Sequence, residues 1–317
     1  MTTLESAGPV PPGAVARGLA ARKPRYGEKA IKAFFFLCAC LSVATTAAIA
    51  VSLLEPTFEF FGEVGIGEFF TSTTWAPLFA DPQFGVLPLV SATLLITGIA
   101  ILVAVPMGLL TATYLQQYAR PRTRSLLKPT LEVLAGIPSV VYGFFALTLV
   151  TPLLQDLWPF GDPPGIFNAA SAGVVMGIMI VPTIASLSED AMAAVPRSLA
   201  EGAYALGSNR MRVSTRVIMP AALSGIVAAV VLGISRAIGE TMIVLIAAGG
   251  TPNLSFDPAQ AMQTMTAFIA SAGIGDQPTG STGYKTIFAV GTTLFIITFM
   301  MNMLSIRLVR RFRQVYE

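Results

Sequence analysis

Two side chains of opposite charge lie inside a long apolar stretch of the sequence. Arg236 and Glu240 stand four residues apart in LGISRAIGETM, so on a helix they share a face and can pair. A guanidinium is a planar fork of donors that matches phosphate or sulfate oxygens, and the carboxylate would hold this fork until an anion displaces it. The alternative interpretation is an ion pair that only locks helices together.

The carboxylate of Glu240 also bears on the choice of anion. A carboxylate accepts hydrogen bonds, and hydrogen phosphate has a proton to donate, whereas sulfate at neutral pH has none. If Glu240 lies in an anion path, we therefore expect it to favour phosphate over sulfate.

A second stretch is polar and basic although apolar runs precede and follow it. It reads EGAYALGSNRMRVSTRVIMP, from Glu201 to Pro220. EGAYAL predicts a short helix that ends at Gly207, and Ser208 or Asn209 is a candidate N-cap for another. Pro220 then suits the first turn of the following apolar run. Two short helices joined by a glycine form a compact projection, which is suited to docking a partner.

The composition excludes several kinds of chemistry. The chain contains no His, which removes the commonest metal ligand and general base. No phosphate-binding loop is present, since GYKT at Gly283–Thr286 lacks the preceding glycine that this motif requires. We therefore predict no catalytic residue, no metal site, no cofactor and no nucleic-acid partner.

The chain is predicted to be an all-α integral membrane protein. It is 54% hydrophobic and only 12% charged, whereas soluble domains carry about 25% charged residues. A helix that crosses a bilayer needs about 20 apolar residues, and six stretches qualify. They are approximately Ala33–Leu54, Leu87–Gln116, Val133–Gln155, Pro163–Ser188, Ala221–Ala248 and Thr286–Ile306.

The basic residues predict that both chain ends are cytoplasmic. Eighteen of the 20 Lys and Arg residues fall in the N-terminal tail, in the second and fourth connections, or at the C-terminus. Basic connections remain on the cytoplasmic side, so Glu201–Pro220 is cytoplasmic as well. Arg236 then lies near mid-membrane, where a charge costs at least about 3 kcal/mol unless it faces the protein interior or a wet cavity.

Helix breakers and two long connections complete the pattern. AGIPS in the third span places a glycine and a proline within one turn, and such breaks often mark substrate paths in transporters. The external connection Glu55–Asp81 is acidic and aromatic, and Gly249–Lys285 contains AQAMQTMTAFIASAGIG, which predicts an interfacial helix or a re-entrant segment. Both connections either receive a partner or simply cap the bundle.

The spacing in the basic stretch resembles the EAA loop of ABC importer permeases. That pattern is Glu-Ala-Ala, three residues, Gly, nine residues and Ile-x-Leu-Pro; here Gly202 replaces the first Ala, and Val217 and Met219 replace Ile and Leu. In that family the loop sits in a groove of the ATP-hydrolysing subunit, so ATP would be handled by a separate polypeptide. The alternative is a basic loop that only sets topology. The resemblance implies that coupling to the ATPase is carried by Glu201, Gly202, Ala203, Gly207 and Pro220.

Five strings together resemble the PstC-type permease subunits of phosphate importers. They are GIPSVVYGFF, SEDAMAAVP, EGAYALG, MPAALSGI and RAIGETM, within a likeness from about Phe84 to Arg313. The resemblance implies a type I (MetI-like) bundle in the bacterial inner membrane, with Arg236 and Glu240 in the phosphate pathway. It also implies a second permease subunit like PstA, two ATPase subunits like PstB and an external binding protein like PstS.

Other assignments remain open from the residues alone. The sister PstA-type subunit shares the architecture, and a permease for another oxyanion, an anion channel filtered by Arg236 or an ion-driven secondary transporter are alternatives. For Glu189, Asp190, Ser139 and Tyr142, position alone favours helix packing or capping. We expect a disordered basic cytoplasmic tail over residues 1–30, the first span with its acidic external loop over 31–86, and the permease domain over 87–313, which includes a cytoplasmic coupling loop at 189–220.

Overall fold

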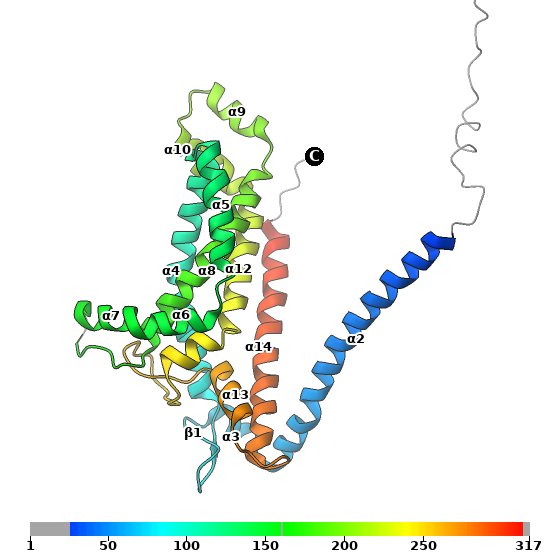
Figure 1. Cartoon of the computed structure of the whole chain (residues 1–317), viewed down its shortest axis with the longest axis vertical. Helices are drawn as coiled ribbons and strands as arrows, with labels where there is room; N and C mark the ends of the chain where they lie inside the picture. Colours follow the sequence, from blue (N-terminus) through cyan, green and yellow to red (C-terminus); the bar gives the residue numbers. More distant parts are fainter. Residues whose placement is uncertain (1–25, 160, 313–317) are drawn as a thin grey trace, which may run out of the picture. The chain divides into compact units, whose positions relative to one another are not determined.

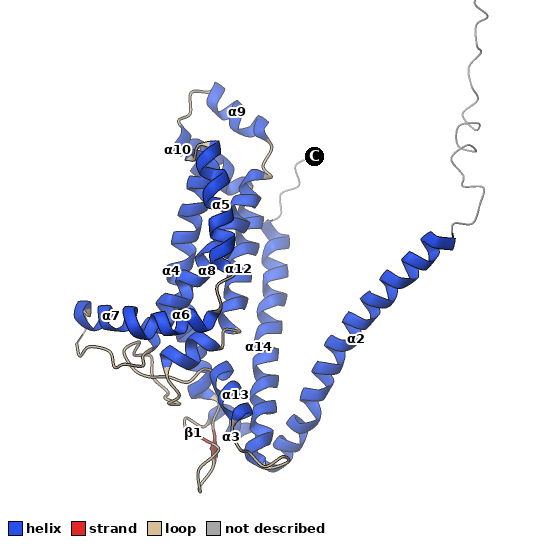
Figure 2. Cartoon of the chain, in the orientation of Figure 1, coloured by secondary structure: helices blue, strands red, loops and turns tan. Residues whose placement is uncertain are grey.

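A computed structural model of the protein describes residues 26–159 and 161–312, and helices form nearly all of its regular structure (Figure 2). The chain divides into two compact units, of which the first ends at Ser52 and the second comprises Leu53–Glu317. Of the tail predicted to be disordered, residues 1–25 lie outside the described residues and Tyr26–Ala30 are helical.

The first long helix, α2 (Tyr26–Glu63), contains the first predicted span and extends nine residues beyond it. Its apolar side chains before Ser52 are exposed within the chain; those of Phe34, Phe35 and Phe36 are 63–67% exposed. Such a helix matches a surrounding of lipid or partner protein rather than water. The rest of the predicted external loop forms α3 (Ile66–Thr71) and an antiparallel pair of short strands, β1 (Trp75–Ala76) and β2 (Gln83–Phe84).

Three long helices pack side by side in the second unit (Figure 1). They are α4 (Leu87–Thr113), which continues into the π-helical turn η1 (Tyr114–Tyr118), α8 (Ala169–Ala193) and α12 (Leu223–Ile238). The last helix, α14 (Thr282–Phe312), packs beside α12. The central helix α8 is mostly buried; Asn168 is its N-cap, and its first residue, Ala169, lies six residues after the predicted start of the fourth span.

Two glycines let α8 approach α4 closely. Gly173 and Gly177 form a Gly-x-x-x-Gly pair, an arrangement that brings the backbones of membrane helices together. A Cβ atom at Gly177 would lie 2.7 Å from the carbonyl oxygen of Ala100, and one at Gly173 would lie 2.7 Å from the side chain of Ile99. Any side chain at these positions would therefore push the two helices apart.

The third span differs from its prediction, because the expected start at Val133 is wrong. Residues 121–135 form a separate helix, α5 (Pro121–Ala135), and a new helix begins only after Pro138. Proline has no N–H and disfavours helical backbone at the residue before it, so the helix stops at Gly136–Pro138. The following run of α6 (Ser139–Phe145), π-helical η2 (Ala146–Val150) and α7 (Thr151–Leu157) lies across the direction of α4 and α8 in Figure 1.

The fifth span is bent at its start and broken before its end. Its first part consists of α10 (Arg210–Val213), π-helical η3 (Ser214–Ile218) and α11 (Met219–Ala221), and the chain bends by 73° before α12. Pro220 therefore lies before the bend and not, as predicted, in the first turn of the spanning helix. Proline and π-helical turns are common causes of such kinks. After α12 the chain is non-helical at Glu240, and a last π-helical turn, η4 (Val244–Ala248), follows.

The count and the sidedness of the spans agree with the six-span prediction. In the described residues five helices are long and apolar enough to cross a membrane, and the bent pair Arg210–Ala221 with Leu223–Ile238 makes a sixth. Within the second unit, α9 (Arg197–Ala205) and α10 lie at one end, and β1, α3 and α13 (Met265–Ile274) lie at the other (Figure 1). The predicted cytoplasmic and external connections are thus at opposite ends.

We expect Gly177→Ala to lower the free energy of unfolding by about 1–3 kcal/mol, because the new methyl group overpacks the contact with α4. Gly98→Ala on α4 is the control, since no atom lies within 4 Å of a Cβ there. Thermal unfolding of the two purified variants measures the difference. Equal unfolding temperatures would contradict the close packing of α4 and α8.

Candidate functional site

Arg236 is half-buried in the last turn of α12, a helix that packs against α8. Its Nη1 donates a hydrogen bond to Oγ1 of Thr183 on α8, at 3.0 Å. The half-buried phenol of Tyr142 on α6 interacts with it electrostatically. Helices α12 and α8 therefore position one positive charge in the interior of the bundle.

The predicted pair between Arg236 and Glu240 does not form. Within the described residues no ion pair joins them, because α12 ends at Ile238 and the helical spacing is lost before Glu240 is reached. Glu240 instead caps the next helical segment: its Oε1 accepts hydrogen bonds from the backbone N–H groups of Met242 at 3.0 Å and Ile243 at 3.4 Å. In the part of the chain that the structure describes, the Arg236 guanidinium has no carboxylate partner.

The break at Glu240 is stabilised from a second direction. The carbonyl oxygen of Glu240 accepts a hydrogen bond from Oγ1 of Thr266 on α13, at 2.6 Å. A backbone group in an apolar surrounding costs several kcal/mol when it has no partner, so this contact from the external end permits the helix to stop here. The sequence did not identify Thr266, and its only signal was a threonine within an otherwise apolar run.

The segment predicted to couple to an ATPase begins with the compact projection that the sequence predicts, formed by α9 and α10. Gly207 adopts a left-handed conformation (φ +80°) after α9, and its N–H donates to the carbonyl oxygen of Tyr204 at 2.9 Å. Asn209 caps α10, since its side chain accepts from the N–H of Arg212 at 2.9 Å. Both stop and start signals are thus confirmed, with Asn209 rather than Ser208 as the cap.

The two faces of α9 differ in exposure. Ala203 packs against the apolar cluster under the projection, which contains Met192 and Val213. Glu201 and Gly202 are exposed, and Leu206 at the end of the helix is 88% exposed. A large apolar side chain this exposed at the tip of a projection is typical of a contact surface for another protein.

A buried carboxylate beneath this projection was not predicted as a site. Glu189, near the end of α8, is 0% exposed and accepts hydrogen bonds from Nη2 of Arg124 and, at 2.7 Å, from Nζ of Lys128 on α5. Lys128 also binds Asp190. The hydrogen bonds from Lys128 to Asp190 and Glu189 raise the pKa of Lys128, so it stays charged. This is the packing role expected for Glu189 and Asp190, and the i,i+4 spacing of Arg124 and Lys128 was its signal.

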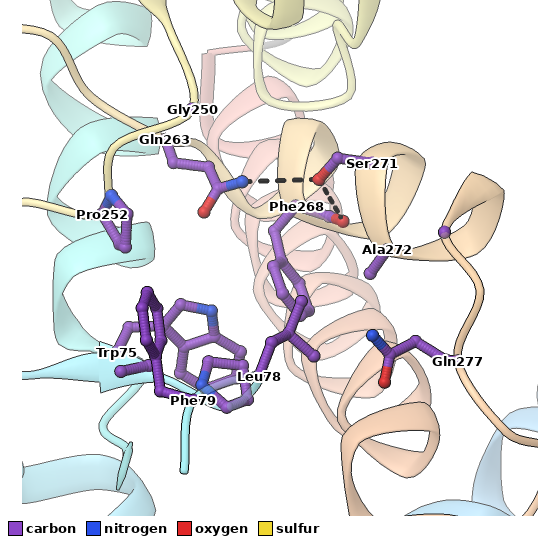
Figure 3. Close-up of a pocket in the computed structure, with 13 residues that line it drawn as sticks. Trp75, Leu78, Phe79, Gly250, Pro252, Gln263, Phe268, Ser271, Ala272 and Gln277 are labelled. Carbon is purple, nitrogen blue, oxygen red and sulfur yellow. Dashed lines mark hydrogen bonds between the residues drawn. The ribbon is translucent and has the colours of Figure 1, made fainter. Parts of the chain in front are cut away.

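The external end holds an aromatic cavity of about 210 Å³ between the β1–β2 turn and α13 (Figure 3). Its walls include Trp75, Phe79, Phe268 and Gln263, and no ionisable side chain lines it. The indole Nε1 of Trp75 is buried and has no hydrogen-bond partner in the described part of the chain. The helix predicted within Gly249–Lys285 is confirmed, since α13 forms one side of this cavity.

Comparison with known proteins assigns the architecture. The profile of the family described as "Binding-protein-dependent transport system inner membrane component" matches residues 104–314. The chain belongs to this family. It is therefore a permease of multi-pass membrane type.

Two relatives narrow this assignment to a more specific group of permeases. The permease is 35% identical over 269 residues to the probable ABC transporter permease protein YqgH of Bacillus subtilis, covering 84% of this chain and 86% of that protein. It is 33% identical over 307 residues to the phosphate transport system permease protein PstC of Haemophilus influenzae, covering 90% and 94%. The resemblance to PstC-type permeases that the sequence strings predict is thus confirmed.

The fold is that of ABC importer permeases. A bacterial ABC transporter involved in the import of the acidic polysaccharide alginate has a TM-score of 0.60 at 17% identity, and the match covers 90% of this chain and 99% of that chain. The MetNI methionine ABC transporter has a TM-score of 0.52 at 19% identity, covering 73% and 95%. At these identities the likeness concerns the fold alone, and it agrees with the MetI-like bundle that was predicted.

Proposed function

We propose that this permease is the transmembrane subunit of an ATP-driven importer of inorganic phosphate in a bacterial inner membrane, and that it forms half of the translocation pathway. The observation that carries the proposal is the half-buried guanidinium of Arg236, which lacks a carboxylate partner within the described residues. Its remaining donors are available to an oxyanion, for which the planar fork is suited. The likeness to relatives such as the phosphate transport system permease protein PstC supports phosphate as that oxyanion.

Glu240 belongs to the same pathway in this proposal, with a role other than pairing with Arg236. One of its oxygens, Oε1, accepts both capping hydrogen bonds, and Oε2 accepts none in the described structure. The unused oxygen can accept the proton of hydrogen phosphate but finds no proton on sulfate. Selection of phosphate over sulfate would therefore depend on Oε2 of Glu240, which the capping hydrogen bonds to Oε1 hold in place.

The permease makes and breaks no covalent bond in this scheme, and the driving force comes from partner subunits. The importer contains two ATPase subunits like PstB, and the exposed side of α9, with Glu201 and Leu206, is the proposed contact with one of them. A second permease subunit like PstA completes the pathway and supplies further cations, because one guanidinium cannot neutralise a dianion. An external binding protein like PstS delivers phosphate at the end that carries the aromatic cavity.

Arg236→Gln tests the central observation in the importer assembled with its partner subunits in proteoliposomes. We expect phosphate uptake and phosphate-stimulated ATP hydrolysis to fall about 10- to 100-fold. A hydrogen bond to a charged group contributes about 1.5–3 kcal/mol, and its loss corresponds to this change. Arg307→Gln, at the exposed end of α14, is the matched loss of one charge and should retain both activities. Undiminished uptake by Arg236→Gln would refute the assignment.

Glu240→Gln tests anion selection, because the amide keeps an oxygen for the cap and replaces the second oxygen by an N–H donor. We expect the assembled importer to retain its fold and to lose its preference for phosphate over sulfate. Competition of labelled phosphate uptake by increasing sulfate is the measurement. Unchanged competition would exclude Glu240 from selection.

Glu201→Lys tests the coupling surface. We expect normal membrane insertion, because Glu201 is exposed and within the described residues makes no ion pair, but uptake should be abolished. Quantification of the chain in membranes and phosphate uptake by the same cells separate the two effects. Normal uptake by this variant would show that the projection only sets topology.

A further inference from the structure

Helix α5 contacts the bundle through one narrow stripe of side chains. Within α5 no residue is fully buried. Five residues are half-buried: Thr123, and the four at the spacing i, i+4, i+7, i+11 that form the stripe, Arg124, Lys128, Leu131 and Ala135. This spacing defines one face of a helix, and that face packs against α8. Two of the four positions on it are cations, so apolar packing accounts for only part of the contact.

Glu189 is the group on α8 that both cations reach. Its carboxylate is fully buried, whereas Asp190 beside it is 57% exposed and binds Lys128 alone. A cavity of about 480 Å³ lies between α5 and the end of η1, and Arg124 and Lys128 line it together with Leu115 and Gln116, so apolar packing contributes little on that side of the two cations. The attachment of α5 therefore depends on α8, and within it on the charge of Glu189.

Both helices joined by Glu189 lead to Arg236. On α8, Thr183 accepts the hydrogen bond from Arg236 and precedes Glu189 by six residues. On the other side α5 ends at the Gly136–Pro138 break, and the hydroxyl of Tyr142 donates back across it to the carbonyl oxygen of Leu134 at 3.1 Å. Tyr142 in turn interacts with Arg236.

The same helix α8 leads to the coupling surface. It ends at Ala193, and only three residues separate it from Arg197, where α9 begins. A displacement of α9 therefore acts first on the end of α8 that carries Glu189. If α5 follows α8 as one body, Thr183, which binds Arg236, and Tyr142, which interacts with it electrostatically, move in the same step.

We propose that Glu189 is a positioning residue that ties α5 to α8, so that movement of the coupling helix α9 reaches Arg236 through Thr183 and Tyr142 together. The proposal rests on the function proposed above. Without the negative charge of Glu189, α8 would move while α5 and Tyr142 lag behind. ATP would then be hydrolysed without a matching change at Arg236.

The test is the number of phosphate ions imported per ATP hydrolysed by the assembled importer in proteoliposomes. For Glu189→Gln we expect this ratio to fall at least tenfold while ATP hydrolysis persists. Asp190→Asn is the control, because it removes a neighbouring charge but leaves Glu189 with both cations, and its ratio should stay within twofold of the unmodified importer. An unchanged ratio in Glu189→Gln, or a proportional loss of uptake and hydrolysis, would overturn the proposal.

Glu189→Asp separates charge from packing. It keeps the charge and shortens the side chain, so we expect it to recover at least half of the ratio. A loss as complete as that of Glu189→Gln would show that the volume of the side chain is what matters, and the proposal would fail.

A second measurement does not depend on the substrate. Spin labels at Leu126→Cys on α5 and Leu187→Cys on α8, both exposed, report the separation of the two helices in a chain with Cys38→Ser and Cys40→Ser. We expect one narrow distance with Glu189 and a broadened distribution in Glu189→Gln. An unchanged distribution would refute the tie between α5 and α8, whereas an importer that moves no phosphate at all but shows this broadening would refute only the proposed function.

Discussion

A polar group within the apolar thickness of a membrane must find its partner inside the protein, and this requirement organises the permease. Where a helix is interrupted, nearby groups of the protein supply the hydrogen bonds that the helix no longer makes. At the break before Glu240, the carboxylate of that residue accepts a backbone N–H, and Thr266 donates to its carbonyl oxygen. The buried charge of Glu189 is paired with two cations. Removal of one partner from such a cluster typically lowers the stability of a protein by about 3–5 kcal/mol.

Arg236 is the exception, because its charge is not balanced by a carboxylate in the described residues. One of its nitrogens binds a neutral hydroxyl, and the described residues supply no carboxylate to balance its charge. In a medium of low dielectric constant an unbalanced charge attracts an anion more strongly than it would in water. A site that leaves a guanidinium in this state is suited to an anionic substrate, and a structural ion pair would have removed this property.

The central helix α8 connects these features because it serves as both packing core and carrier of contacts. Its glycines bring it against α4, Thr183 holds Arg236 and Glu189 holds α5. A helix buried along most of its length moves as a rigid rod, since close-packed interiors do not deform continuously. The cytoplasmic projection and the interior charge are therefore attached to one mechanical element, without any residue that touches both.

The sequence by itself determined the features that depend on neighbours along the chain. Apolar length predicted the spans, Lys and Arg placement predicted their sides, and the left-handed Gly207 and the cap at Asn209 follow from side-chain chemistry within a single turn. The tertiary structure decided which polar groups meet. The contact of Arg236 with Thr183 joins residues 53 positions apart, and that of Arg124 with Glu189 joins residues 65 apart. Local spacing suggested that Arg236 pairs with Glu240, but the helix ends between them, because capping hydrogen bonds and Thr266 from a distant segment stabilise the break more directly than a pair could.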